Sequence, residues 1–129
     1  MPLVRIDLQQ GRTAAQVRAI ADAVQDVMLE VFAAPPGDRY QIVTEHPVGH
    51  VIAEGSGLGI ERSDDLVIIQ VFHQGRTAEQ KTQAYAALFR VLAERTGLAS
   101  GDLIVSMVEN TREDWSFAGG RAQFLTGEL

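Results

Sequence analysis

The stretch Gln10-Gly11-Arg12-Thr13-Ala14 recurs as Gln74-Gly75-Arg76-Thr77-Ala78, 64 residues further along a chain of 129 residues. The same shift places Gly37-Asp38 on Gly101-Asp102 and Glu30 on Glu94. The two halves align without a gap. We therefore interpret the chain as an internal duplication, with repeats at 2–46 and 66–110 and a tail at 111–129 that has no counterpart.

The hydrophobic pattern predicts that each repeat is a β-α-β unit. Residues 3–8 alternate between apolar and polar, and residues 66–72 are almost continuously apolar, which predicts two strands. Thr13-Ala14-Ala15-Gln16 and Thr77-Ala78-Glu79-Gln80 match the capping box that begins a helix. Second strands are expected at 39–45 and 103–109. A helical crossover between strands of one sheet makes them parallel.

We predict one domain, residues 1–129, of the α/β (α+β) class with a four-stranded mixed sheet and two helices. Two similar units pack most simply around a pseudo-twofold axis, with their first strands antiparallel. This brings Pro2, Asp38, Gln74 and Arg76 to one edge of the sheet. The opposite edge carries the counterparts Leu66, Asp102 and Arg12.

Pro2 becomes the amino-terminal residue if Met1 is removed, whereas its counterpart Leu66 lies within the chain and has no free amine. A terminal amine ionises near pH ~7.7–8.0, so it serves as a base when neutral and as an acid when protonated. An apolar pocket lowers the pKa of such an amine, and a carboxylate raises it. If Met1 is retained, the amine is blocked and a catalytic role fails.

Composition excludes several classes of protein. The chain has 46% hydrophobic residues, a formal net charge of −6 and no cysteine. The acidic charge argues against a nucleic-acid partner, and the absence of cysteine excludes disulfides and thiolate metal centres. No apolar run approaches the length of a transmembrane helix, and no signal peptide is recognised, so we expect a cytoplasmic protein that does not contact a membrane.

Two histidines have the spacing of helical zinc ligands, but the residue between them opposes a helix. His46 and His50 are four residues apart, and Pro47 lies between them. We therefore expect no metal site.

The duplication also supplies a structural alternative for the carboxylate and the guanidinium. Asp38 and Arg76 are repeated at an edge that has no amine, so the repeat leaves structural and catalytic roles open. His73 is expected to be a polar loop residue, with a role in substrate binding still open. The apolar tail residues pack on this core, pack on a neighbouring subunit, or line the site. They are Trp115, Phe117 and Phe124.

Pro2, Asp38 and Arg76 on a duplicated β-α-β frame resemble the tautomerase superfamily, whose members use an amino-terminal proline. Three further segments resemble the malonate semialdehyde decarboxylases of that superfamily. They are Asp38-Arg39-Tyr40-Gln41-Ile42-Val43, Gly57-Leu58-Gly59-Ile60 and, most specifically, Asp114-Trp115-Ser116-Phe117 continuing through residues 120–129.

This resemblance implies a homotrimer that decarboxylates malonate semialdehyde (3-oxopropanoate) to acetaldehyde without a metal or an organic cofactor, and it leaves room for a hydratase side activity. It assigns catalysis to Pro2, Asp38 and Arg76. Gln74 occupies the position of a second arginine in the family's Arg-x-Arg pattern. We expect the substrate to contact Gln74, His73, Trp115, Phe117 and Phe124.

Three alternatives to decarboxylation remain open. The same amine serves a keto–enol tautomerase, or a hydratase or dehalogenase acting on a small unsaturated acid. The chain is otherwise a non-enzymatic trimeric binding module in which Pro2 is incidental.

Overall fold

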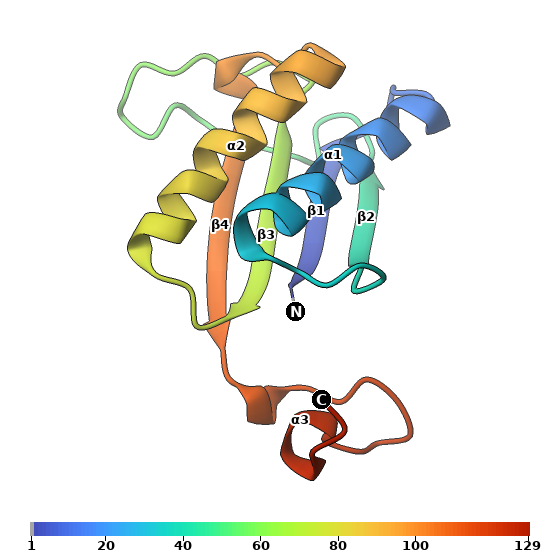
Figure 1. The fold of residues 1–129 in the computed structure, drawn as a ribbon. Coiled ribbons are helices and arrows are strands. Elements are labelled where there is room, and N and C mark those ends of the chain that lie inside the picture. Colours follow the sequence, from blue (N-terminus) through green and yellow to red (C-terminus); the bar gives the residue numbers. More distant parts are fainter. Residues whose placement is uncertain (1) are drawn as a thin grey trace.

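The structure is a computed structural model that describes residues 2–129, so the prediction that Met1 is removed concerns a residue outside the described range. Each repeat forms the expected strand, helix and strand (Figure 1). The main elements are β1 (Leu3–Gln9), α1 (Ala14–Phe32), β2 (Tyr40–His46), β3 (Val67–Gln74), α2 (Ala78–Thr96) and β4 (Leu103–Asn110). Shorter elements are η1 (Ser100–Asp102), η2 (Arg112–Asp114) and α3 (Gln123–Thr126).

The four strands form one mixed sheet in the order β2-β1-β3-β4. β1 is parallel to β2 and β3 is parallel to β4, as the helical crossovers require. The two first strands, β1 and β3, are adjacent and antiparallel, with Ile6 paired to Ile69. The predicted fold class and the side-by-side arrangement of the repeats are therefore confirmed.

Both long helices begin at the predicted capping boxes. The Thr13 hydroxyl accepts from the Gln16 amide at 3.2 Å while the Gln16 side chain accepts from the Thr13 amide at 2.8 Å. Thr77 and Gln80 make the same exchange at 3.1 and 2.9 Å. Both helices end in a left-handed residue, which is Gly97 after α2 but Ala33 after α1.

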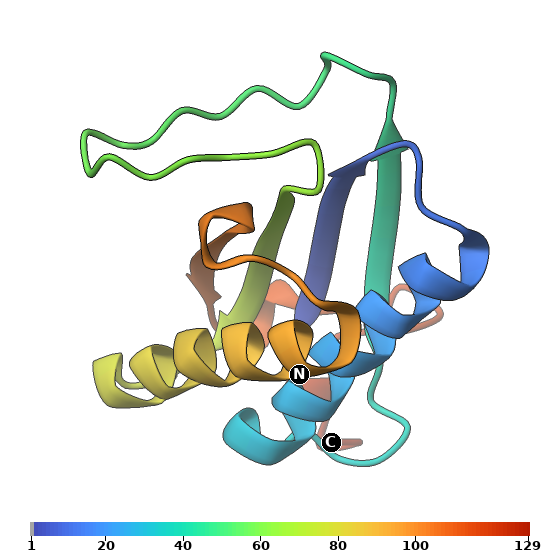
Figure 2. The same cartoon turned by 90° about the horizontal axis from the view of Figure 1, so that it is seen from above.

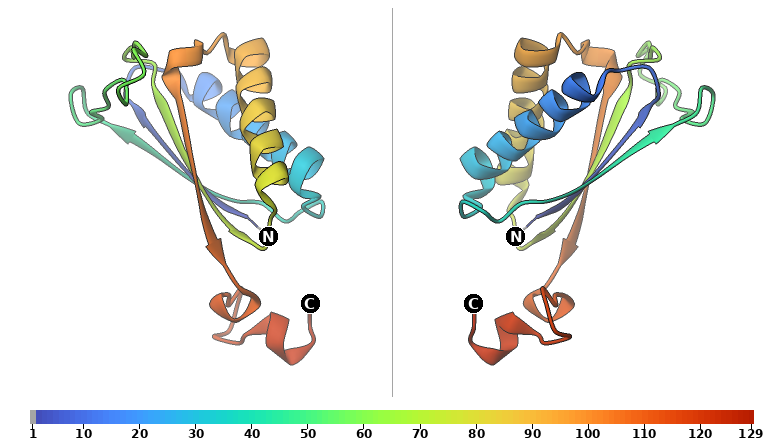
Figure 3. Two further views of the ribbon diagram at one scale, coloured as in Figure 1. Left: turned by 90° about the vertical axis from the view of Figure 1, so that its left-hand side faces the viewer. Right: turned by 90° about the vertical axis from the view of Figure 1, so that its right-hand side faces the viewer.

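Both helices cover the same face of the sheet, as Figures 2 and 3 show from two directions. Alternate residues of β1 and β3 point to this face, and the helices contribute residues at 3.6-residue spacing. Fully buried examples are Ile6, Leu8, Ile20, Met28, Ile69, Leu88 and Leu92. The other sheet face has no helix over it among the described residues, and Ile42 there is 46% exposed.

Two segments extend from this frame. Residues 47–66 form a long connection without a regular helix or strand, which projects beyond the sheet (Figure 2). The tail leaves β4 at Asn110 and folds below the sheet, at the edge where β1 begins (Figures 1 and 3). Within residues 2–129, neither α1, α2 nor any shorter helix has the length and apolarity needed to cross a bilayer.

Candidate active site

The strand register brings the start of β1 next to the end of β3. Leu3 pairs with Phe72 in β3 and with Tyr40 in β2. One step further along this register, Pro2 lies opposite His73 and beside the residue that follows Asp38. Pro2 is buried and, like Val4, belongs to the helix-facing side of β1. The edge predicted from the duplication therefore brings together the start of the chain, Asp38 and the end of β3.

Asp38 is a buried carboxyl group without a partner. The residue is 6% exposed, and neither Oδ1 nor Oδ2 has a hydrogen-bond partner within residues 2–129. Its backbone amide donates to the Pro35 carbonyl at 3.0 Å, which holds the turn between α1 and β2. Burial raises the pKa of Asp38 above its ordinary value of 3.8, because a low-dielectric environment disfavours the charged form. Among the described residues, no contact of its side chain offsets the cost of burying this carboxyl group. A cationic partner would do so.

Its duplicate, Asp102, has a different environment. Asp102 is also buried, at 4% exposure, but Ser63 donates to it from the backbone amide at 2.7 Å and from the hydroxyl at 2.5 Å. Ser63 belongs to the long connection between the repeats, which has no counterpart after β4. Asp102 therefore has an ordinary structural role, whereas Asp38 does not have these partners.

Arg76 is held by the main chain at the end of β3. Its guanidinium donates to the Gln74 carbonyl at 2.8 Å and to the Phe32 carbonyl at 3.0 Å. It also lies over the Phe32 ring, with Cζ 5.1 Å from the ring centroid. No carboxylate among the described residues neutralises it through an ion pair, so Arg76 is a fixed cation that remains available to an anionic ligand.

The expectation that His73 is a loop residue is wrong. β3 continues to Gln74, so His73 is a strand residue on the helix-facing side, and it is 1% exposed. Nδ1 lies 3.3 Å from the Gln74 carbonyl, the ring packs against Phe32, and Nε2 has no partner within residues 2–129. Burial lowers the pKa of His73 below its ordinary value of 6.5, so the imidazole is neutral near pH 7.

Gln74 lines a groove that we call the strand-exit groove. The Gln74 Nε2 amide is buried and has no hydrogen-bond partner among the described residues. The groove lies between the end of β3 and the beginning of the tail. Its lining comprises Gln74, Gly75, Arg76, Glu109, Asn110, Thr111, Arg112 and Asp114.

The three aromatic residues of the tail form one cluster with a residue of the sheet. Phe117 stacks on Trp115 with ring centroids 5.5 Å apart, and Phe124 meets Phe117 edge-on at 5.5 Å. Tyr40, at the start of β2, lies 5.7 Å from Phe117. The Trp115 indole donates to Asn110 Oδ1, at the end of β4, at 2.8 Å. The cluster therefore lies at the edge that holds Asp38 and Arg76.

Sequence reasoning missed three residues that shape this region. Phe32 provides a carbonyl and a ring to Arg76, Ser63 satisfies Asp102, and Arg112 lines the strand-exit groove. Arg112 could have been identified from the sequence, because it is a cation in the tail, which follows the second repeat and has no counterpart after the first. Phe32 and Ser63 are recognised only through contacts 44 and 39 residues apart along the chain.

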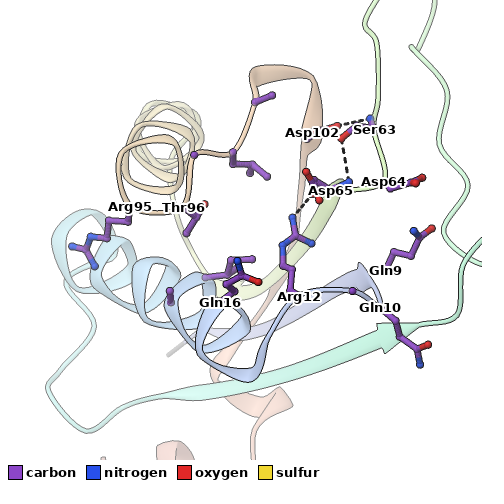
Figure 4. Close-up of a pocket in the computed structure, with 16 residues that line it drawn as sticks. Gln9, Gln10, Arg12, Gln16, Ser63, Asp64, Asp65, Arg95, Thr96 and Asp102 are labelled. Atoms are coloured by element: carbon purple, nitrogen blue, oxygen red, sulfur yellow. Dashed lines mark hydrogen bonds between the residues drawn. The ribbon is translucent and has the colours of Figure 1, made fainter.

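A further cavity lies at the opposite edge. It measures ≈ 820 Å³ and surrounds Arg12, which is the duplicate of Arg76 (Figure 4). Arg12 donates a hydrogen bond to the Asp65 carbonyl at 2.5 Å, and the Asp102 carboxylate accepts one from the Ser63 hydroxyl. Asp64 and Asp65 also line this cavity, but it lies at the edge of the sheet away from the start of β1, so its carboxylates do not lie beside Pro2.

His46 is engaged with a carboxylate of the sheet. Its Nε2 lies 2.7 Å from Asp7 Oδ1 on the face of the sheet opposite the helices. Within residues 2–129, no group of three potential metal-ligating side chains gathers in one place.

The fold and this edge together define a duplicated β-α-β protein with a partnerless buried carboxyl group, a fixed guanidinium and a proline at the start of β1. Comparison with known proteins specifies the family. Two family models described as tautomerase enzyme match residues 38–118 and 2–60. The chain belongs to the tautomerase family.

Curated relatives span the whole chain. It is 47% identical to "Probable tautomerase YrdN" of Bacillus subtilis (strain 168) over 100% of both chains. It is 29% identical to "Probable tautomerase YusQ" of the same organism, over 97% of this chain and 99% of that protein.

Solved structures provide a second line of comparison. Malonate semialdehyde decarboxylase, solved in wild-type, mutant and inactivated forms and described as having decarboxylase and hydratase activities, is 42% identical with a TM-score of 0.94 over 98% of each chain. A malonate semialdehyde decarboxylase inhibited by 3-bromopropiolate is 50% identical, also with a TM-score of 0.94, over 98% of this chain and 97% of that one. A fused 4-OT symmetric trimer, 24% identical with a TM-score of 0.78 over 97% and 98%, shares the fold.

Proposed function

We propose that this protein decarboxylates malonate semialdehyde to acetaldehyde and carbon dioxide, using the amine of Pro2 after removal of Met1. The observation that carries the proposal is the buried Asp38 carboxyl group without a partner among the described residues, one residue before the position that lies beside Pro2 in the strand register. The similarity to two malonate semialdehyde decarboxylases at 42% and 50% identity supports the same substrate.

In this proposal, Pro2 and Asp38 hold each other in charged form. A carboxylate raises the pKa of a nearby amine, and a cation lowers the pKa of a nearby carboxyl group. The burial that disfavours an isolated Asp38 carboxylate strengthens its interaction with an ammonium group. Pro2 is then protonated near neutral pH and donates a hydrogen bond to the aldehyde oxygen of the substrate.

Decarboxylation then proceeds through an enolate. The bond between the carboxylate carbon and C2 breaks, and its electron pair passes into C2 and the aldehyde oxygen. The Pro2 ammonium stabilises the charge that develops on this oxygen, which lowers the barrier selectively. Transfer of one proton to C2 gives acetaldehyde. Arg76 binds the substrate carboxylate, and an iminium formed between Pro2 and the aldehyde is a competing route.

The remaining site residues shape the environment of the reaction. Gln74 offers an unpartnered amide where the resembling family has an arginine. The cluster of Trp115, Phe117 and Phe124 provides an apolar wall that favours loss of the carboxylate charge. His73, neutral and buried, offers Nε2 as a hydrogen-bonding group. No step requires a metal or an organic cofactor.

We also propose that the protein is a homotrimer. The sheet face opposite the helices exposes the apolar side chains of Ile42 and Val108, at 46% and 38%. An unpaired apolar sheet face is typical of a surface buried between subunits. The fused 4-OT structures, which share the fold, are described as trimers.

Keto–enol tautomerisation is the second candidate, because the relative at 47% identity carries the name "Probable tautomerase". It requires a neutral Pro2 acting as a base, whereas the proposed decarboxylation requires a protonated Pro2. The pKa of the Pro2 amine, measured by NMR titration, therefore separates the two candidates. A value well above 7 supports decarboxylation, and a value well below 7 supports tautomerisation.

The decisive experiment assays 3-oxopropanoate decarboxylation and phenylenolpyruvate tautomerisation in parallel, with wild type, Pro2→Ala and Arg76→Ala. Mass spectrometry first establishes that Met1 is absent. We expect wild type to release carbon dioxide, and both variants to lose this activity by more than about a hundredfold. Turnover of the enol alone would overturn the decarboxylase assignment. Undiminished activity of Pro2→Ala would remove the Pro2 ring amine from the mechanism, and absence of both activities in wild type would support a binding module.

A further inference from the structure

The strand-exit groove is lined by two arginines that come from different parts of the fold. Arg76 follows β3, and Arg112 lies in η2 of the tail. Gln74 also lines the groove, and its Nε2 has no partner within the described residues. Guanidinium groups donate hydrogen bonds and accept none, and the unpartnered Gln74 Nε2 is a further donor, so together they suit an anion with several oxygens.

The guanidinium of Arg112 is fixed before any ligand binds. Its Nη2 donates to the main-chain oxygens of Phe124 and Leu129, at 3.2 and 3.3 Å. Its Cζ lies 4.7 Å from the centroid of the Phe124 ring. These contacts use one nitrogen and one face of the group, and within residues 2–129 neither Nε nor Nη1 makes a hydrogen bond. A prepositioned guanidinium loses less conformational entropy when it binds an oxyanion.

Two acidic residues also line the groove, and they restrict where an anion can bind. Asp114 Oδ2 accepts hydrogen bonds from the Thr111 amide at 2.7 Å and its hydroxyl at 3.2 Å. Glu109 is exposed. The two arginines and the two acidic residues of the lining nearly cancel in charge, so the groove does not attract anions through its net charge. A carboxylate gains most where it contacts both guanidinium groups together.

At the opposite edge, the second arginine comes from a different element. Arg12, the duplicate of Arg76, shares its cavity with Arg95 at the end of α2, and Arg95 is paired with the Asp26 carboxylate at 2.5 Å. The tail that carries Arg112 has no counterpart in the first repeat. A guanidinium supplied by the tail is therefore specific to the edge that contains Pro2.

We propose that Arg112 binds the substrate carboxylate together with Arg76, and so provides the second cation at a site where residue 74 is a glutamine. The inference rests on the proposed function for the identity of the substrate, but not for the binding of a small 3-oxo acid. It makes Arg112 a specificity-determining residue for carboxylates, and links the tail directly to substrate binding.

A binding experiment tests Arg112 without depending on turnover. Acetoacetate serves as the charged probe, acetoacetamide as its neutral counterpart, and Trp115, the one tryptophan of the chain, as the fluorescent reporter. We expect Arg112→Gln to raise the acetoacetate Kd about tenfold, with a change of less than about twofold for acetoacetamide. Arg112→Lys keeps the charge and should retain most of the acetoacetate affinity.

Arg121→Gln is the matched control, because Arg121 belongs to the same tail and pairs with Glu128 outside the groove. It should leave the Kd of both probes unchanged. Gln74→Arg restores a second guanidinium within the groove, so the double variant Gln74→Arg/Arg112→Gln should recover most of the acetoacetate affinity. With 3-oxopropanoate, Arg112→Gln should raise KM and leave kcat nearly unchanged.

Four outcomes would overturn the inference. They are an unchanged acetoacetate Kd in Arg112→Gln, an equal loss for both probes, an equal effect of Arg121→Gln, and failure of wild type to bind acetoacetate. If wild type binds acetoacetate through Arg112 but does not decarboxylate 3-oxopropanoate, the proposed function fails and the assignment of Arg112 stands.

Discussion

Asp38 and Asp102 occupy equivalent positions in the two repeats and both are buried, yet only the carboxyl group of Asp102 has hydrogen-bond partners among the described residues. Ser63 satisfies both oxygens of Asp102, and the first repeat has no residue in this role. A duplicated acid has therefore taken a structural role at one edge and is free for chemistry at the other. This difference separates stability from activity in two of the predictions that follow.

Removal of the Ser63 hydroxyl should destabilise the fold. Ser63→Ala leaves Asp102 Oδ2 buried without its 2.5 Å donor. We expect the free energy of unfolding to fall by ~1–3 kcal/mol, the usual cost of an unsatisfied buried group. Urea unfolding measures the change. Decarboxylation by the folded variant should match wild type, and a large loss of kcat would contradict a purely structural role for Asp102.

Asp38→Asn should affect activity rather than stability, the reverse of what we expect for Ser63→Ala. Because burial raises the pKa of Asp38, the folded state is less stable with the ionised carboxylate, and stability is lost as the pH rises through this pKa. The proposed pairing with the Pro2 ammonium opposes this burial cost, so the neutral amide should change the unfolding free energy at pH 7 by less than about 1 kcal/mol. The difference should vanish below the ordinary carboxyl pKa of 3.8. Decarboxylation should fall steeply, and an active Asp38→Asn variant would remove Asp38 from the mechanism.

His73 should make the fold sensitive to acid. Burial lowers the pKa of His73 in the folded state, so the unfolded chain binds the proton more tightly. The stability that neutral His73 contributes is present above its ordinary pKa of 6.5 and is lost as the pH falls through its lower folded pKa. His73→Gln should lose less stability than wild type between about pH 7.5 and about pH 5. Parallel slopes in urea unfolding would show that His73 titrates equally in both states.

Phe117 should connect the tail to the sheet. It contacts Tyr40, Trp115 and Phe124 through ring pairs of 5.5–5.7 Å. Phe117→Ala removes three pairs worth ~0.5–1.5 kcal/mol each beyond their buried area. We expect a shift of Trp115 emission to longer wavelength and a lower kcat/KM. Leu125→Ala, at a tail residue that is 64% exposed, is the control and should change neither measurement.

Ala33→Gly should stabilise the protein. Ala33 ends α1 with a φ of 50°, a left-handed conformation that its duplicate Gly97 adopts at 71° without a side chain. Relief of this strain should raise the unfolding free energy by ~1 kcal/mol, and Gly97→Ala should lower it by a similar amount. A loss of stability in Ala33→Gly would show that the entropy of glycine in the unfolded state outweighs the strain.

Much of the fold was predictable because its signals are local. The capping boxes at Thr13 and Thr77 begin helices where expected. The predicted strand at 39–45 differs from β2 by one residue at each end, and the one at 103–109 differs from β4 by one residue at its end. The largest error concerns β3, which extends two residues beyond the expected end at 72. Its last residues pair with Glu109 and Asn110 of β4, and this pairing outweighs their polar character.

The sequence by itself determined the duplication, the helix starts, the strand order and the edge where Pro2, Asp38 and Arg76 gather, because periodicity and capping act over a few residues and the repeat supplies the symmetry. Only the tertiary structure decided which of the two equivalent aspartates is satisfied, where His73 points and that Arg112 lines the same groove as Arg76. These properties depend on Ser63, Phe32 and the tail, which reach the site from 12 to 44 residues away. Hydrogen bonds and desolvation at a buried group depend on such distant neighbours, and no local pattern records them.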